Sequence, residues 1–240
     1  SFKLVKKDLQ GIIAPSFISP TGKYIMWYDS KARHYFVWDG TIVRNISQKI
    51  KFPLWNEEED TPDDPPPYGL MGWGKGDSDV YIYDRYDIWQ VSVGTGDAVT
   101  TTAGRINKIR FRYVQTDREE RTIPDSRLVR LFNETNKSES LKEWYINGQR
   151  KNGFLEGRTE YLHIDNIMKA KYSSVLLMTK ENFKQSPDLF TNAVIDINKN
   201  ADGAGPYAHL QLSDINPQQK EYNWGSAELY KWKAFTGKMA

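Results

Sequence analysis

The chain has 240 residues, which is long enough to bury a sizeable core, and all-β domains of this length commonly remain undivided. Its 33 basic and 31 acidic side chains leave a formal net charge of +2, which gives no long-range field for nucleic acid or anionic lipid. No stretch approaches the roughly 20 consecutive apolar residues that cross a bilayer. Without cysteine there is no disulfide framework, Cys-based metal site or thiol nucleophile. We expect neither a nucleic-acid partner nor a membrane partner.

Aromatic residues make up 13% of the chain and occur mostly in short runs with β-branched neighbours, a composition that favours strands. Residues 17–39 read FISPTGKYIMWYDSKARHYFVWD, with two apolar runs separated by polar turn residues. Residues 72–97, GWGKGDSDVYIYDRYDIWQVSVGTGD, repeat this order of signals. Each passage predicts a strand, a turn and a second strand.

Further along the chain the same pattern weakens but continues. A third unit is predicted from strands near 108–114, 127–132 and 144–146, and a fourth from strands near 174–178 and 193–197. Residues 227–232 alternate like one more strand, residues 159–171 allow a turn or two of helix, and residues 56–67 and 198–206 are predicted as loops.

Repeats of roughly 40 to 55 residues with several strands each are typical of propeller blades. The sequence therefore predicts an all-β fold, a partial β-propeller of about four four-stranded antiparallel blades. We expect residues 1–240 to form a single propeller segment.

Sequence signatures of catalysis are missing. There is no G-x-S-x-G elbow for a serine hydrolase, no H-E-x-x-H zinc site and no phosphate loop. His34, His163 and His209 lie in sequence segments that are predicted to be strands or strand ends. Asx residues alternate from Asp196 to Asp202 as in a calcium loop, but the closing Glu is absent, which favours a plain turn. We predict no catalytic residue, no metal ion and no cofactor.

One acidic run is a candidate binding element. Glu57, Glu58, Glu59 and Asp60 are followed by Asp63 and Asp64, and clustered carboxylates favour a positive partner such as a substrate's ammonium group. The alternative interpretation is a solvated loop.

Five passages occur in an order that resembles a known family: ISPTGKYIMWYD, FPLWNEEEDTPDDPPPYGLMGW, VYIYDRYDIWQV, MTKENFKQSPDLF and NPQQKEYNWGSAELYKW. Together they resemble the propeller portion of the prolyl oligopeptidase family of serine peptidases. The similarity is greatest to dipeptidyl-peptidase-IV-like and acylaminoacyl-peptidase-like members from Bacteroidetes. DRYDIW and YNWGSAEL are the more specific of these phrases.

The resemblance implies a function for the chain. In that family a propeller covers a C-terminal α/β-hydrolase domain that holds the Ser, Asp and His, so the catalytic domain is expected outside this chain. The chain itself would be the non-catalytic region of a secreted or periplasmic serine exopeptidase, gating and orienting peptide substrates. A propeller-borne Glu pair holds the substrate's amino terminus in dipeptidyl peptidases, which implies this role for Glu57 and Glu58. The three prolines that follow depart from the family's pattern. The other hypothesis is a stand-alone propeller that binds a protein or glycan partner.

Overall fold

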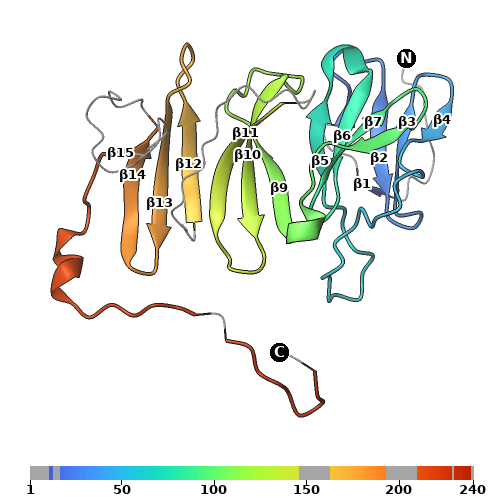
Figure 1. Ribbon diagram of the computed structural model, residues 1–240. Coiled ribbons are helices and arrows are strands. Elements are labelled where there is room, and N and C mark those ends of the chain that lie inside the picture. Colours follow the sequence, from blue (N-terminus) through green and yellow to red (C-terminus); the bar gives the residue numbers. More distant parts are fainter. Residues whose placement is uncertain (1–10, 13–16, 146–162, 193–209, 229, 239–240) are drawn as a thin grey trace. The chain divides into compact units, whose positions relative to one another are not determined.

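The computed structural model describes residues 11–12, 17–145, 163–192, 210–228 and 230–238 (Figure 1). In this part of the chain the strands form four antiparallel sheets, and the neighbours within each sheet are consecutive in the sequence. A meander of three or four strands is the architecture of a propeller blade. The all-β fold class predicted from the sequence is confirmed.

The first two sheets contain four strands each. The first sheet consists of β1 (Gly11–Ile12), β2 (Ile25–Asp29), β3 (His34–Trp38) and β4 (Val43–Asn45). The second consists of β5 (Leu70–Trp73), β6 (Asp79–Tyr83), β7 (Ile88–Ser92) and β8 (Ala98–Thr100), with the 3-10 turn η2 (Lys75–Asp77) between β5 and β6. The aromatic runs predicted as strands are the central pairs β2–β3 and β6–β7, and their buried residues are most continuous in β2 and β6.

The third sheet has three described strands, which are β9 (Ile109–Val114), β10 (Ser126–Asn133) and β11 (Glu139–Tyr145), and the 3-10 turn η3 (Arg105–Asn107) precedes it. The fourth sheet consists of β12 (His163–Lys169), β13 (Leu176–Asn182), β14 (Gln185–Thr191) and β15 (Leu210–Gln211). The 3-10 helix η5 (Pro217–Glu221) follows β15.

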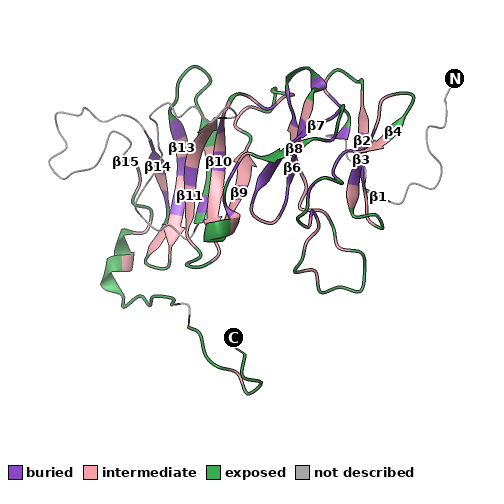
Figure 2. Cartoon of the chain, turned by 45° about the vertical axis from the view of Figure 1, so that its right-hand side comes forward, coloured by how far each residue is buried: buried purple, intermediate pink, exposed green. Residues whose placement is uncertain are grey.

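Two apolar clusters join the first three sheets, and buried residues run through their middle strands (Figure 2). Side chains that are inaccessible to solvent connect the first sheet with the second, including Met26, Tyr28, Val37, Val80 and Ile82. A second cluster connects the second sheet with the third through Tyr81, Phe111 and Val129 among others. Burial of each such side chain contributes roughly 1.5–3 kcal/mol, so sheet-to-sheet packing stabilises this part of the chain.

The chain divides into two compact units, residues 1–131 with 142–153 and residues 132–141 with 154–240. The division passes through the third sheet. The last residues of β10, the first residues of β11 and the turn between them belong to the second unit. The single segment over residues 1–240 stays a prediction.

One helical prediction is wrong. Residues 163–169 form strand β12, which pairs with β13. A bulge between Asp165 and Met168, with Asn166 at φ +52°, interrupts the alternation of inward and outward side chains. The two least exposed residues of the strand, Ile164 and Ile167, are therefore three positions apart, a spacing that is also typical of a helix. Residues 227–228 and 230–232 form no strand. The strand predicted at 193–197 and the loop predicted at 198–206 lie outside the described residues.

Candidate functional site

The acidic loop, residues 56–67, connects the first sheet to the second and is closed at its base. Trp55 forms an antiparallel bridge with Pro67, and the Asn56 N–H donates to the Pro66 carbonyl at 2.7 Å. The Tyr68 N–H donates to the carbonyl of Leu54, which is buried in the core. The loop therefore leaves and re-enters the fold at one fixed point, and its six acidic side chains, with no basic one among them, project from there.

Glu57 is held by a tyrosine at the end of the loop. Its N–H donates to the Tyr68 hydroxyl oxygen at 3.0 Å, and that hydroxyl in turn lies 3.5 Å from Glu57 Oε2. Burial of the Tyr68 ring raises the pKa of its hydroxyl, so this group remains a donor at neutral pH. Both the backbone and the carboxylate of Glu57 thus have a defined position beside Tyr68.

Glu58 is held by an arginine from the turn between β6 and β7. Arg85 Nη2 donates to Glu58 Oε1 at 2.6 Å, and the guanidinium carbon lies 5.3 Å from the centre of the Tyr86 ring. The Glu58 side chain is 59% exposed and that of Arg85 22%, so the pair is open to solvent on the carboxylate side. A second ligand can reach Glu58 without displacing Arg85.

The far side of the acidic loop is held by the first sheet. Lys31, in the turn between β2 and β3, lies 2.7 Å from Asp64 Oδ2. Arg33 in the same turn lies 4.8 Å from the centre of the Trp55 ring. Two ion pairs, one from each flanking sheet, therefore fix the two ends of the loop.

Arg112, on strand β9 at one end of the third sheet, connects the contacts of both carboxylates to the core. Its Nη2 donates to the carbonyls of Asp84 and Arg85 at 3.2 Å each, and its guanidinium lies 5.8 Å from the Tyr68 ring centre. Burial lowers the pKa of Arg112, but a guanidinium stays charged at physiological pH. Arg112 therefore positions Arg85, which contacts Glu58, and packs against Tyr68, which contacts Glu57.

The charge balance of the acidic loop favours a cation. Among the described residues, ion pairs connect only Glu58 and Asp64 to basic groups, and Glu59 instead accepts hydrogen bonds from Thr61. The remaining carboxylates of the loop leave an excess of negative charge at an exposed position. A primary ammonium group with three donors is well suited to two neighbouring carboxylates.

The phrase DRYDIW, residues 84–89, explains how the Arg85 turn is fixed. Asp84 is inaccessible to solvent and accepts hydrogen bonds from the N–H groups of Tyr86 and Asp87, from Trp89 Nε1 and from Arg105 Nη2, all within 2.9 Å. Both carboxylate oxygens are thus satisfied inside the protein, so Asp84 has a structural role.

The sequence-predicted site residues Glu57 and Glu58 contact different partners in the acidic loop, Glu57 contacting Tyr68 and Glu58 contacting Arg85. Sequence reasoning missed Tyr68, Arg85 and Arg112. Arg85 lies inside the phrase DRYDIW, and Arg112 belongs to the run IRFRYV, where a basic residue at alternate strand positions was the signal that could have found it.

The histidines do not assemble a catalytic site in the described residues. His34 Nδ1 lies 3.0 Å from Ser47 Oγ, and burial lowers the pKa of its imidazole. His163 lies on β12 beside Glu139, and His209 is outside the described residues, as is the calcium-like segment 196–202. Within the described residues no three His, Cys, Asp or Glu side chains lie close enough to hold a metal ion.

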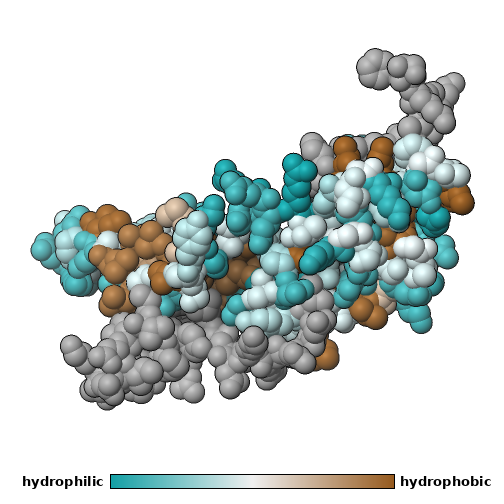
Figure 3. Space-filling model, turned by 90° about the horizontal axis from the view of Figure 1, so that it is seen from above, coloured by the Kyte–Doolittle hydropathy of each residue, from teal (hydrophilic) through white to brown (hydrophobic). Residues whose placement is uncertain are grey.

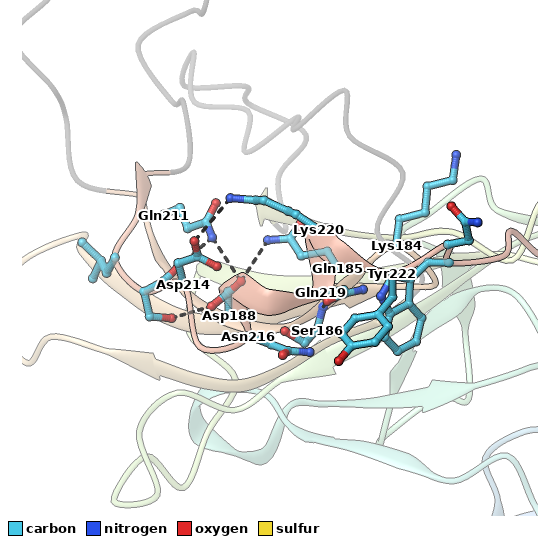
Figure 4. Close-up of a pocket in the computed structure, with 14 residues that line it drawn as sticks. Lys184, Gln185, Ser186, Asp188, Gln211, Asp214, Asn216, Gln219, Lys220 and Tyr222 are labelled. Atoms are coloured by element: carbon cyan, nitrogen blue, oxygen red, sulfur yellow. Dashed lines mark hydrogen bonds and ion pairs between the residues drawn. The ribbon is translucent and has the colours of Figure 1, made fainter.

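A second feature lies in the second unit, where residues 184–186, 188, 211–214, 216, 219–220 and 222–224 line a hollow of about 1260 Å³ (Figure 4). Asp188 accepts hydrogen bonds from Gln211 Nε2, Ser213 Oγ and the Ile215 N–H, so its carboxylate holds the hollow's edge together. Hydrophobic side chains gather over this unit in Figure 3, and its exposed apolar side chains include Leu210, Leu212, Ile215, Tyr222 and Trp224.

Comparison with known proteins gives no identification. No family model matches the chain, and no curated protein matches it. In the described part of the chain, no helix is both long and apolar enough to cross a membrane.

Proposed function

We propose that this chain is the non-catalytic propeller region of a serine exopeptidase, and that the acidic loop holds the free amino terminus of a peptide. The observation that carries the proposal is the arrangement of Glu57 on Tyr68 and Glu58 on Arg85. These contacts hold the carboxylates of two consecutive residues and leave both residues exposed to solvent. Bond cleavage belongs to an α/β-hydrolase domain of the same polypeptide, outside residues 1–240, in a secreted or periplasmic enzyme.

The chemistry of the chain is then selection. A protonated amino terminus binds between the carboxylates, and an N-acylated peptide, which has no positive charge there, does not. Arg85 keeps the Glu58 carboxylate in place.

The test uses the 240-residue chain and two ligands, Ala-Pro-amide and its N-acetylated form, in calorimetric titrations. We expect the free amine to bind at least about tenfold more tightly than the acetylated form. Glu57→Gln and Glu58→Gln should each weaken binding of the amine. Asp60→Asn is the matched control, because it removes a carboxylate from the same loop and should leave the affinity unchanged.

Equal binding of the two ligands, or equal effects of all three substitutions, would show that the acidic loop is only a solvated connection. The peptidase assignment is tested separately on the encoding gene, where a G-x-S-x-G pentapeptide is expected about a hundred residues after Ala240. The isolated chain should show no turnover of chromogenic dipeptide or acyl-peptide substrates.

The alternative function is a stand-alone module that binds a protein or glycan partner. The exposed Tyr222 and Trp224 beside the hollow of the second unit favour it, because aromatic side chains with one polar end are frequent at recognition surfaces. A stop codon directly after Ala240 would favour this module over the peptidase.

A further inference from the structure

A cavity of about 410 Å³ lies in the first unit at the end of strands β5 and β9. No residue of the acidic loop is among those that line it. The last residues of β5 form one wall and the segment 120–123 between β9 and β10 forms another, and residues 18–20, Tyr113 and Gln115 complete the lining. A volume of several hundred Å³ is typical of pockets that hold small ligands.

The apolar wall of this cavity is preformed. Trp73 and Ile123 are 3% and 8% exposed, and the Ile123 N–H donates to the Trp73 carbonyl at 2.7 Å. The Ile123 side chain also occupies the space beside Gly72, where an added Cβ would lie 2.7 Å from Ile123 Cδ1. Gly72 has φ +152°, which glycine adopts readily, so this backbone brings the two walls into direct contact.

A buried positive charge lies directly behind this wall. Arg127 on β10 is 2% exposed, and its Nη1 lies 4.0 Å from the sulfur of Met71, which lines the cavity. Its guanidinium carbon lies 4.7 Å from the centre of the Tyr81 ring. Within the described residues no ion pair connects a carboxylate to Arg127, and its Nε and Nη2 lack a hydrogen-bond partner. Burial lowers the pKa of Arg127, and the neighbouring Tyr81 hydroxyl, which favours the charged guanidinium, raises it.

Such a guanidinium keeps its charge, because its pKa lies far above neutrality even where burial lowers it. Buried charges are normally paired, and an unpaired one makes the surrounding potential positive. An anion in the adjacent cavity therefore gains from Arg127 without touching it.

The rim of the cavity adds polar groups. Arg121, Glu120 and Gln115 are exposed there, and Thr122, the residue after Arg121, also lines the cavity. Arg121 supplies a planar guanidinium that matches the geometry of a carboxylate. Among the residues that line the cavity, Arg121 is the one basic and Glu120 the one acidic group, so the buried Arg127 behind the wall adds a positive charge to a balanced rim.

We propose that this cavity binds a carboxylate attached to an apolar group, such as the C-terminal end of a short peptide whose last side chain is apolar. The apolar group packs on Trp73 and Ile123, and the carboxylate binds Arg121 within the positive potential of Arg127. This inference does not depend on the peptidase assignment, because it uses other residues and the opposite charge.

The test uses N-acetyl-leucine and N-acetyl-leucinamide, which differ only in the carboxylate, titrated into the full chain. Binding is followed by the NMR signal of the Trp73 indole N–H, assigned through Trp73→Phe. We expect the acid to shift this signal saturably and to bind at least about tenfold more tightly than the amide. Arg121→Gln should weaken the acid and leave the amide unchanged, and Arg118→Gln, an exposed arginine nearby that does not line the cavity, should change neither.

Arg127→Met replaces the buried charge with an apolar side chain of similar length, which buried sites commonly tolerate. It should reduce the preference for the acid and leave the signal of the unbound Trp73 in place. Equal affinities for acid and amide, or a Trp73 signal that moves with neither, would overturn the proposal. If Arg127→Met does not fold, the ligand pair and Arg121→Gln still decide the outcome.

Discussion

Replacement of Asp84 tests how the turn that carries Arg85 is stabilised. Asp84→Ala removes the acceptor of two backbone N–H groups, of Trp89 Nε1 and of Arg105 Nη2. Each buried donor left without a partner costs about 1–3 kcal/mol, and loss of one partner of a buried ion pair costs about 3–5 kcal/mol. Arg105 is 30% exposed and regains water, and the three other donors cost about 3 kcal/mol even at the lower limit, so we expect a total loss of at least about 3 kcal/mol.

Asp84→Asn keeps the shape of the side chain and one acceptor oxygen, so it should cost less, about 2–3 kcal/mol. Asp29 is the matched control, because it occupies the equivalent place after Tyr28 in the first sheet. Its Oδ1 accepts only from the N–H groups of Lys31 and Ala32 in a solvent-exposed turn. Asp29→Ala should cost about 1 kcal/mol or less.

The free energy of unfolding of each variant is measured by urea denaturation followed by tryptophan fluorescence, with the slope compared to that of the parent chain. If Asp84→Ala cost no more than Asp29→Ala, the four hydrogen bonds would not organise the turn, and the positioning of Arg85 would need another explanation.

Three further predictions concern stability. Burial lowers the pKa of Lys180 in the folded chain to about 7, below that of the unfolded chain, so the unfolded state binds more protons between about pH 7 and 10.5. Stability should therefore rise across this range in thermal scans, and Lys180→Met should abolish the rise. Gly104→Ala should destabilise by more than about 2 kcal/mol in urea titrations, because the new Cβ would lie 2.1 Å from the Ile109 carbonyl oxygen; an unchanged midpoint contradicts this packing. In a double-mutant cycle, Glu58→Gln with Arg85→Met should give a coupling of about 0.5–1 kcal/mol that high salt removes, and zero coupling at low salt would contradict the ion pair.

The central strands of the first two sheets could be predicted from sequence because their apolar runs are dense, whereas the short outer strands β1, β4, β5 and β8 were not predicted. The run ending in Trp27-Tyr28-Asp29 and the run ending in Tyr83-Asp84 are buried central strands, and each boundary falls at the turn residues. Burial on both faces keeps such segments apolar throughout, which makes them visible without any knowledge of their partners.

Strand β14 could not be predicted, because it contains Pro187 and Asp188 within a polar segment. Proline removes a ladder donor and normally argues against a strand. Here the register between β13 and β14 shifts between Lys180 and Asn182, and Pro187 lies opposite this bulge, where no ladder hydrogen bond is required. The bulge that accommodates Pro187 lies on β13, so the sequence around Pro187 does not reveal it.

Only the acidic residues of the candidate site could be predicted from the sequence. The carboxylates of Glu57 and Glu58 stand out because they are consecutive. Their partners Tyr68, Arg85 and Arg112 come from three other positions in the chain, and each has an unremarkable local context as a strand or turn residue. Contacts between sheets decide their roles, and such contacts have no signature in a single sequence.

The most direct test is a crystal structure of the chain with Ala-Pro-amide bound. We predict that the peptide's amino nitrogen lies about 3 Å from carboxylate oxygens of Glu57 and Glu58, with Arg85 still in contact with Glu58. A peptide bound elsewhere, or an acidic loop that leaves the ligand's amino group in solvent, would contradict the proposed function.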